Sequence, residues 1–136
     1  MGGLSALAPR QRQATMNDTQ ENHDLRERTK EFALRIVRMY VSLPKTPEAQ
    51  VLGKQVLKSG TSPGAHYHEA CRSRSPVEFI SKMAVGLQEL EETTYWLELL
   101  VDSGIVPAKR MAGLLKETDE LTAIFASSVI TAKKNQ

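Results

Sequence analysis

Residues 75–101 read SPVEFISKMAVGLQELEETTYWLELLV, and this stretch has the strongest helical pattern in the chain. Ser75, Pro76 and Glu78 form a capping box with proline at the first helical position, an arrangement that starts helices. The pattern predicts a long bundle-forming helix that ends near Gly104. Its seam has alternating three- and four-residue spacing and consists of Ile80, Met83, Leu87, Leu90, Thr94, Leu97 and Val101.

Three more helices are predicted around this one. The first covers residues 25–43, with Asp24 as its cap and Pro44 at its end. The second begins at Thr46-Pro47, and the last covers residues 107–132. No stretch alternates as a half-buried strand does, and the short links make consecutive helices antiparallel neighbours. We therefore expect an all-α protein, an up-down-up-down antiparallel four-helix bundle.

The inner faces of these three helices follow from apolar spacing. The positions expected to face the core are Leu25, Phe32, Ile36, Tyr40 and Leu43 in the first helix, Val51, Leu52, Gln55, Val56 and Ser59 in the second, and Met111, Leu115, Thr118, Leu121, Phe125, Val129 and Ala132 in the last.

Residues 59–65, SGTSPGA, leave two alternatives for the second helix. Glycine and proline favour a break, because Pro63 removes one backbone hydrogen bond and clashes with the preceding turn. Alternatively, a kinked helix continues to about Arg72, and its small residues pack closely against a neighbouring helix. Local physics does not choose between them.

The domain is expected to span residues 23–136, after a disordered leader at residues 1–22 that is polar and lacks apolar periodicity. No apolar run approaches the roughly 18 residues that a membrane span needs. Cys71 is the single cysteine, so no internal disulfide forms, which fits a reducing cytoplasm. We expect a cytoplasmic protein.

Charge is unevenly distributed along the chain although the net charge is only +2. Residues 24–82 contain eleven Lys/Arg against six Asp/Glu, whereas residues 83–120 contain three against eight. This asymmetry has three interpretations: solvated faces that happen to differ, a positive surface for a polyanion, or opposite faces that meet between subunits.

Part of the positive charge in the first helix is expected to be neutralised locally. Asp24 and Arg28 lie four residues apart in the favourable order, as do Glu31 and Arg35.

A basic stripe is the candidate nucleic-acid surface. If the second helix continues past Pro63, Lys54 and Lys58 share a face that extends through Thr61, Ala65 and His68 to Arg72. The stripe has few exposed aromatic side chains for base stacking, so it suits contact with the phosphate backbone more than reading of bases. The predicted nucleic-acid-binding residues are Lys54, Lys58, Arg72, Arg74 and Lys82.

Residues 95–100 carry more apolar surface than one bundle core needs. Tyr95, Trp96, Leu99 and Leu100 cover faces of the helix other than its seam. A helix that is apolar on all sides is buried on all sides, so we predict that these four residues form an oligomer interface.

The sequence contains no pattern typical of a catalytic or metal centre. His66, His68, Glu69 and Cys71 are the only cluster of possible ligands, and His66 and His68 point apart on a helix. A bundle metal site needs histidines and carboxylates from several helices, and no other predicted helix offers a histidine. We expect no enzyme activity, no cofactor and no metal.

Taken together, the motifs resemble those of a family of small bacterial four-helix-bundle proteins. This family was first noticed in intervening sequences of large-subunit ribosomal RNA genes, and it includes the accessory variability determinant of diversity-generating retroelements. The similar motifs are Arg28-Thr29-Lys30-Glu31-Phe32-Ala33, Leu43-Pro44-Lys45, GKQVLKSGTS at 53–62, Gly64-Ala65, Tyr67, Glu69-Ala70, Ser75, EFISK at 78–82, LQELEET at 87–93 and YWLELL at 95–100.

The resemblance implies a bundle that assembles as a homopentameric ring, with residues 59–65 inside one long second helix. In the retroelement branch, a basic surface binds nucleic acid and the reverse transcriptase. This chain departs from the family at three positions: many members have Ile or Val at Pro63, Asn at His66, and Arg or Lys at His68. The retroelement branch is also much more basic.

Our leading hypothesis is a non-enzymatic, ring-forming helical scaffold whose basic face contacts DNA, RNA or a nucleic-acid-processing partner such as a reverse transcriptase. The alternative is a protein–protein interaction module with no affinity for nucleic acid.

Overall fold

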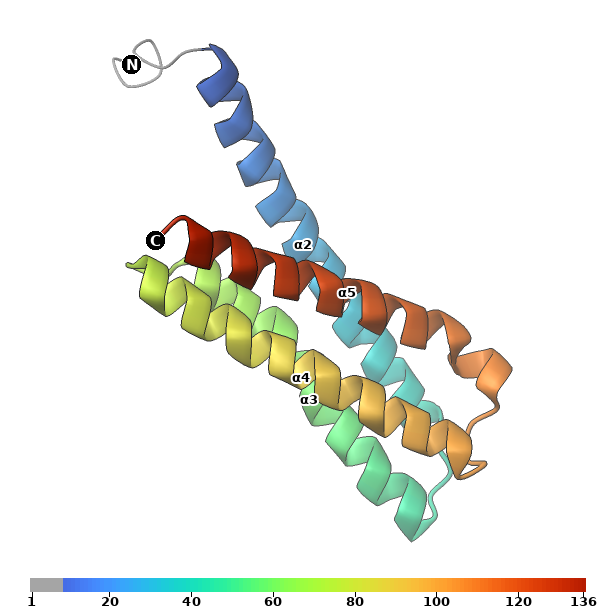
Figure 1. Cartoon of the computed structure of the whole chain (residues 1–136). Coiled ribbons are helices and arrows are strands. Elements are labelled where there is room, and N and C mark those ends of the chain that lie inside the picture. The colour runs from blue at the N-terminus through green and yellow to red at the C-terminus, as the bar shows by residue number, and fades with distance from the viewer. Residues whose placement is uncertain (1–8) are drawn as a thin grey trace.

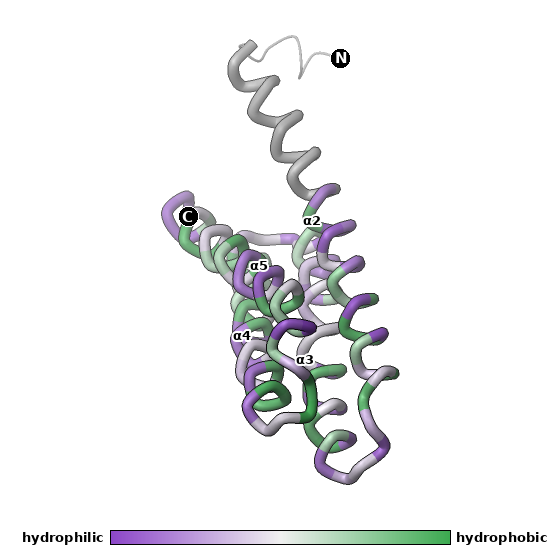
Figure 2. Tube along the Cα trace, turned by 90° about the vertical axis from the view of Figure 1, so that its right-hand side faces the viewer, coloured by the Kyte–Doolittle hydropathy of each residue, from purple (hydrophilic) through white to green (hydrophobic). Residues whose placement is uncertain are grey.

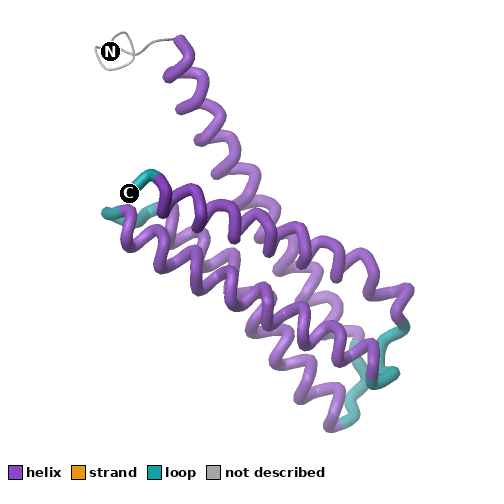
Figure 3. The backbone as a smooth tube through the Cα atoms, in the orientation of Figure 1, coloured by secondary structure: helices purple, strands orange, loops and turns teal. Residues whose placement is uncertain are grey.

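Four helices make up the computed structural model, which describes the backbone of residues 9–136 and the side chains of residues 24–136. They are α2 (Pro9–Ser42), α3 (Pro47–Cys71), α4 (Pro76–Asp102) and α5 (Ala108–Lys134) (Figure 1). Short loops join them, and residues 9–136 contain no strand (Figure 3). The predicted all-α four-helix bundle is confirmed.

Each helix packs along its neighbour in sequence, whereas α2 and α5 close the bundle over a short stretch only. Figure 1 shows α2 diverging from α5 toward its N-terminus. The bundle is therefore tight on the side of α3 and α4 and open between α2 and α5.

The helix boundaries at the loops follow local signals in the sequence. The Ser75 hydroxyl oxygen accepts the Glu78 backbone N–H at 3.1 Å, and the Thr46 hydroxyl oxygen accepts that of Ala49 at 3.4 Å. Gly104 follows α4 with a φ of +80°, which a residue with a side chain rarely adopts. These predicted starts and this predicted stop are confirmed.

The start of α2 differs from the prediction. The helix begins at Pro9, so Asp24 lies inside it and is not its cap. Residues 9–22, expected to belong to a disordered leader, have helical backbone; residues 1–8 of that leader lie outside the described residues. Positions 10–43 contain neither glycine nor proline. Extending an existing helix through such a segment is far less costly than nucleating a new one.

Small residues let α3 lie unusually close to α2. A Cβ atom added at Gly60 would lie 2.7 Å from Ile36 Cγ1, and one added at Gly53 would lie 2.5 Å from Leu43 Cδ1. Pro63 is buried inside α3, which continues to Cys71 without a break. Of the two alternatives for residues 59–65, the continuous helix is correct, because close packing against α2 compensates for the hydrogen bond that proline removes.

The hydrophobic core is built from side chains of all four helices, and hydrophilic and hydrophobic residues are interspersed along the coloured part of each helix (Figure 2). Its largest fully buried side chains are Phe32, Phe125, Ile36, Met83, Leu90, Leu97, Leu100, Met111, Leu121, Val56, Thr93 and Thr118. The predicted inner faces of α2 and α5 are confirmed, with Tyr40, Leu115 and Ala132 half-buried at the edge.

Two inner-face predictions are wrong for α3 and one for α4. Val51 and Gln55 are exposed, because the small residues of α3 form its contact face. In α4, Thr93 rather than Thr94 is fully buried, and its hydroxyl lies 2.9 Å from that of Ser59 in a hydrogen bond between α4 and α3.

Substituting Gly60 by alanine tests the close approach of α2 and α3. The new methyl group would collide with Ile36, which is fully buried and has no room to move. Overpacking of this kind costs about 1–3 kcal/mol, which exceeds the roughly 0.5–1 kcal/mol that alanine gains over glycine in a helix. Urea unfolding followed by circular dichroism should show a net destabilisation of about 1–2 kcal/mol.

The matched control is Gly113→Ala in α5, where the added carbon meets only the flexible end of Arg35, at 3.3 Å. It should be neutral or slightly stabilising. An unfolding midpoint for Gly60→Ala equal to or above that of the wild type would contradict the tight contact.

Candidate nucleic-acid interface

A basic groove runs between α2 and α3 on the outside of the bundle. It has a volume of about 270 Å³, and its lining includes Arg26 and Lys30 from α2 and Thr61, Ala65 and His68 from α3. Arg26 Nη2 lies 3.0 Å from His68 Nδ1, so a side-chain contact bridges the two helices across the groove. Gly64 forms the floor, where an added Cβ would lie 3.3 Å from Thr29.

The middle of the predicted stripe, at Thr61, Ala65 and His68, lines this groove, whereas Lys54, Lys58, Arg72 and Arg74 do not line it. Lys54 and Lys58 are exposed on α3 and share its outer face with Thr61, Ala65 and His68, as their three- and four-residue spacing requires. Arg72 caps the C-terminal end of α3, and Arg74 follows in the loop before α4. In the described side chains, none of these four basic residues has a carboxylate within 4.0 Å.

Lys82 occupies a different place from the rest of the stripe. It extends from α4 and forms an ion pair with Glu69 of α3 at 3.0 Å between Nζ and Oε1. The hydrogen bond from Lys82 lowers the pKa of the exposed Glu69 carboxyl. Lys82 therefore lies on the α4 side of α3 with its charge compensated, and it does not join the groove formed with α2.

The groove also contains Arg26 and Lys30, which sequence reasoning did not select. Their four-residue spacing marks one face of α2, and that signal was available in the sequence. Only the packing of α2 against α3 shows that this face adjoins the basic stripe.

The basic and acidic parts of the chain meet within one subunit. Arg28 of α2 forms two hydrogen bonds of 2.8 Å with the carboxylate of Glu117 and one of 2.7 Å with Glu120, both in α5. The predicted local pair of Arg28 with Asp24 is not formed, because the guanidinium group of Arg28 binds Glu117 and Glu120 of α5 instead. Part of the charge asymmetry thus stabilises the contact between α2 and α5.

The two histidines of α3 contact different helices. His66 Nδ1 lies 2.8 Å from Glu89 Oε1 in α4, whereas His68 faces Arg26 of α2. Burial raises the pKa of the Glu89 carboxyl, and the nearby His66 partly offsets this effect. Within the described side chains, no three histidine, cysteine or acidic residues converge as metal ligands do.

The four predicted interface residues have different environments. Tyr95 is 57% exposed, and its ring meets that of Trp96 edge to face, with 5.0 Å between centroids. Trp96 is half-buried against the core, and Leu99 is half-buried. Leu100 is fully buried inside the bundle, so it belongs to the core of the subunit and its assignment to an interface is wrong.

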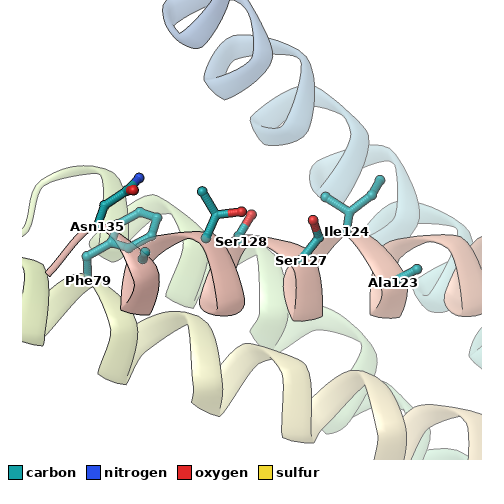
Figure 4. Close-up of a pocket in the computed structure, with 8 residues that line it drawn as sticks. Phe79, Ala123, Ile124, Ser127, Ser128 and Asn135 are labelled. Carbon is teal, nitrogen blue, oxygen red and sulfur yellow. The ribbon is translucent and has the colours of Figure 1, made fainter.

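A second, wider hollow lies beside the C-terminal half of α5 (Figure 4). Its volume is about 600 Å³, and its lining is small or hydroxyl-bearing apart from Phe79, Ile124 and Asn135. None of its lining residues is charged. Among them, the only candidate nucleophiles are the hydroxyl groups of serine and threonine. It offers no electrostatic attraction for a polyanion.

Comparison with known proteins identifies relatives by sequence and by structure. A family model described as 23S rRNA-intervening sequence protein matches residues 21–127. A crystal structure of a protein of unknown function from the S23 ribosomal protein family of Bacteroides thetaiotaomicron is 35% identical, with a TM-score of 0.72. The match covers 76% of this chain and 96% of that one. Among curated proteins, no significant match was found.

Between residues 9 and 136, no helix combines the length and the apolar character that crossing a bilayer demands.

The Arg28–Glu117 contact predicts a pH-dependent contribution to stability. Arg28 holds the pKa of Glu117 below its ordinary value of 4.5, so the stabilisation is present above that value and is lost as the pH falls through the lower, folded-state pKa. Because both side chains are partly exposed, Glu117→Gln should cost only about 1 kcal/mol at pH 7. The difference from the wild type should disappear in the acid range, as measured by urea unfolding.

Glu91→Gln is the control, because Glu91 is exposed and forms no ion pair with a described side chain. A difference for Glu117→Gln that stayed constant from pH 7 to pH 3 would show that the pair is not electrostatic.

Proposed function

The chain belongs to the 23S rRNA-intervening sequence protein family, and on that basis we propose that it is a non-enzymatic helical scaffold that binds the phosphate backbone of nucleic acid along the α2–α3 groove. The observation that supports this proposal is the groove in which Arg26 and Lys30 meet Thr61, Ala65 and His68, which lie on the same face of α3 as Lys54, Lys58 and Arg72.

The groove offers positive charge that the subunit itself leaves uncompensated. Elsewhere in the described side chains, Arg28 and Lys82 are neutralised by carboxylates, and His66 lies against Glu89. Among the described side chains, no such partner is found for Arg26, Lys30, Lys54, Lys58, Arg72 or Arg74. Basic side chains that line a groove attract phosphates strongly while reading little base sequence.

Assembly would multiply this modest charge. Each subunit carries a net charge of only +2, but a ring would repeat the groove and let several weak contacts act together. We propose a homopentamer, as the family resemblance implies, with Tyr95, Trp96 and Leu99 at the subunit interface. A reverse transcriptase is the protein partner that the resemblance suggests.

Binding should be weak, insensitive to sequence and strongly dependent on salt. Each phosphate contact contributes a slope of about −0.9 to the log–log plot of affinity against salt on duplex DNA. Lys58→Glu/Arg72→Glu and Arg26→Glu/Lys30→Glu should each weaken binding by at least about tenfold for every sequence and flatten the slope by about two contacts. Fluorescence anisotropy with labelled single- and double-stranded DNA and RNA measures both quantities.

Lys109→Glu/Lys116→Glu is the charge-matched control. Both lysines are exposed on one face of α5, which is not a neighbour of α3, so this variant should keep most of the affinity. Absence of wild-type binding to DNA and RNA near 50 mM salt would favour the alternative, a protein–protein interaction module without affinity for nucleic acid.

The assembly is tested through Tyr95. Tyr95 is more exposed than Trp96, so its substitution should leave the core intact. Tyr95→Glu should therefore lower the mass measured by light scattering without reducing helicity. Val41→Glu, at a position that is 67% exposed on α2, is the control and should leave the mass unchanged. A wild-type protein that is monomeric at tens of micromolar would refute the oligomer.

A further inference from the structure

The opposite flank of α2 carries a second basic feature, a cavity between α2 and the start of α5. Its volume is about 320 Å³, and three arginines line it: Arg35 and Arg38 from α2 and Arg110 from α5. It lies where the loop after α4 leads into α5, at the other end of α2 from Arg26. It is therefore separate from the α2–α3 groove.

The three guanidinium groups have no ion-pair partner among the described side chains. Arg35 helps to lower the pKa of Glu117, but the carboxylate of Glu117 is held by Arg28 at 2.8 Å. Three like charges around one cavity repel each other, and a bound anion would relieve that repulsion.

The start of α5 increases this positive potential. No side chain caps the helix, and its first turn contains Lys109 and Arg110 but no acidic residue. Cations at a helix N-terminus are unfavourable because the helix dipole is positive there, whereas an anion is stabilised. The position of Arg110 in the first turn of α5 thus lowers the stability of the ligand-free protein and favours the binding of an anion.

The lining of the cavity also contains buried apolar side chains. They are those of Val106, Met111 and Leu114, and each is less than 10% exposed. Gly113 leaves space beside Arg35, since an added Cβ there would lie 3.3 Å from Nη2. A cavity that combines three guanidinium groups with apolar side chains matches a ligand with a phosphate and an apolar ring.

We infer that this cavity binds the phosphate monoester of a nucleotide, with the arginines on the phosphate and the base against the apolar side chains. The same chemistry is present in a free nucleoside monophosphate and at the 5′-phosphate end of a nucleic-acid strand. The inference goes beyond the proposed function, because it requires neither the α2–α3 groove nor an oligomer.

Isothermal titration of the full chain with adenosine 5′-monophosphate, inorganic phosphate and adenosine tests the ligand class. The monophosphate should bind most tightly, because only it engages both the arginines and the apolar side chains. Arg38→Gln and Arg110→Gln should each weaken its binding by about tenfold or more, the effect of losing one charge-assisted hydrogen bond. Lys133→Gln, in the last turn of α5 and thus at the opposite end of that helix from the cavity, should leave its affinity unchanged.

Three results would overturn the inference: no binding of the monophosphate at 5 mM, equal affinity for adenosine and the monophosphate, or equal affinity in Arg110→Gln and the wild type. Lys58→Glu/Arg72→Glu should retain monophosphate binding even if it no longer binds long nucleic acid. Failure of the groove and failure of this cavity are thus distinguishable.

The same Lys58→Glu/Arg72→Glu variant distinguishes the two sources of the phosphate. Preference for a 5′-phosphorylated over a 5′-hydroxyl oligonucleotide identifies a strand end, whereas binding of the monophosphate alone identifies a free nucleotide. Either result supports the inferred chemistry.

Arg110→Glu provides a readout that a purely structural arginine would not give. An acidic residue in the first turn of α5 should raise the thermal midpoint of the ligand-free protein by about 3 °C, since it complements the helix dipole and the two arginines of α2. It should at the same time abolish monophosphate binding. A lowered midpoint would show that Arg110 serves the fold, and would overturn the inference.

Discussion

The close contact of α3 with its neighbours is the constraint on which the rest of the structure depends. Gly60 lies where any side chain would collide with Ile36, and Gly86 of α4 has the same relation to Phe125 of α5. Such contacts leave little freedom for one helix to rotate or slide against another, because protein interiors are close-packed. The hydroxyl contact of Ser59 with Thr93 adds a directional link between α3 and α4.

This packing determines which charged side chains meet. With Gly60 and Gly64 against α2, the outer face of α3 turns toward the same side as Arg26 and Lys30, and the α2–α3 groove results. The α4 flank of α3 instead pairs Glu69 with Lys82. The orientation of α3 about its own axis thus leaves positive charge uncompensated on its α2 flank and neutralises positive charge on its α4 flank.

The looser side of the bundle depends on electrostatics more than on packing. Between α2 and α5, Arg28 forms hydrogen bonds with Glu117 and Glu120. Further along the same flank, Arg35, Arg38 and Arg110 line one cavity without acidic partners among the described side chains. Complementary charge holds the first part of this flank together, and the cavity lies where that complementarity ends. An open flank with uncompensated cations is a suitable place for an anionic ligand.

The sequence by itself determined the four helices apart from the start of α2, the caps at Thr46 and Ser75, the stop at Gly104 and the family resemblance, because hydrogen bonds at helix ends and apolar periodicity act over a few residues. It left open whether α3 continues through Pro63, since the cost of proline is local but its compensation comes from α2. Only the tertiary structure decided that Leu100 is core, that Lys82 is paired and that Arg26 joins the groove. Those outcomes depend on how each helix is rotated about its axis, and that rotation is set by contacts between residues far apart in the chain.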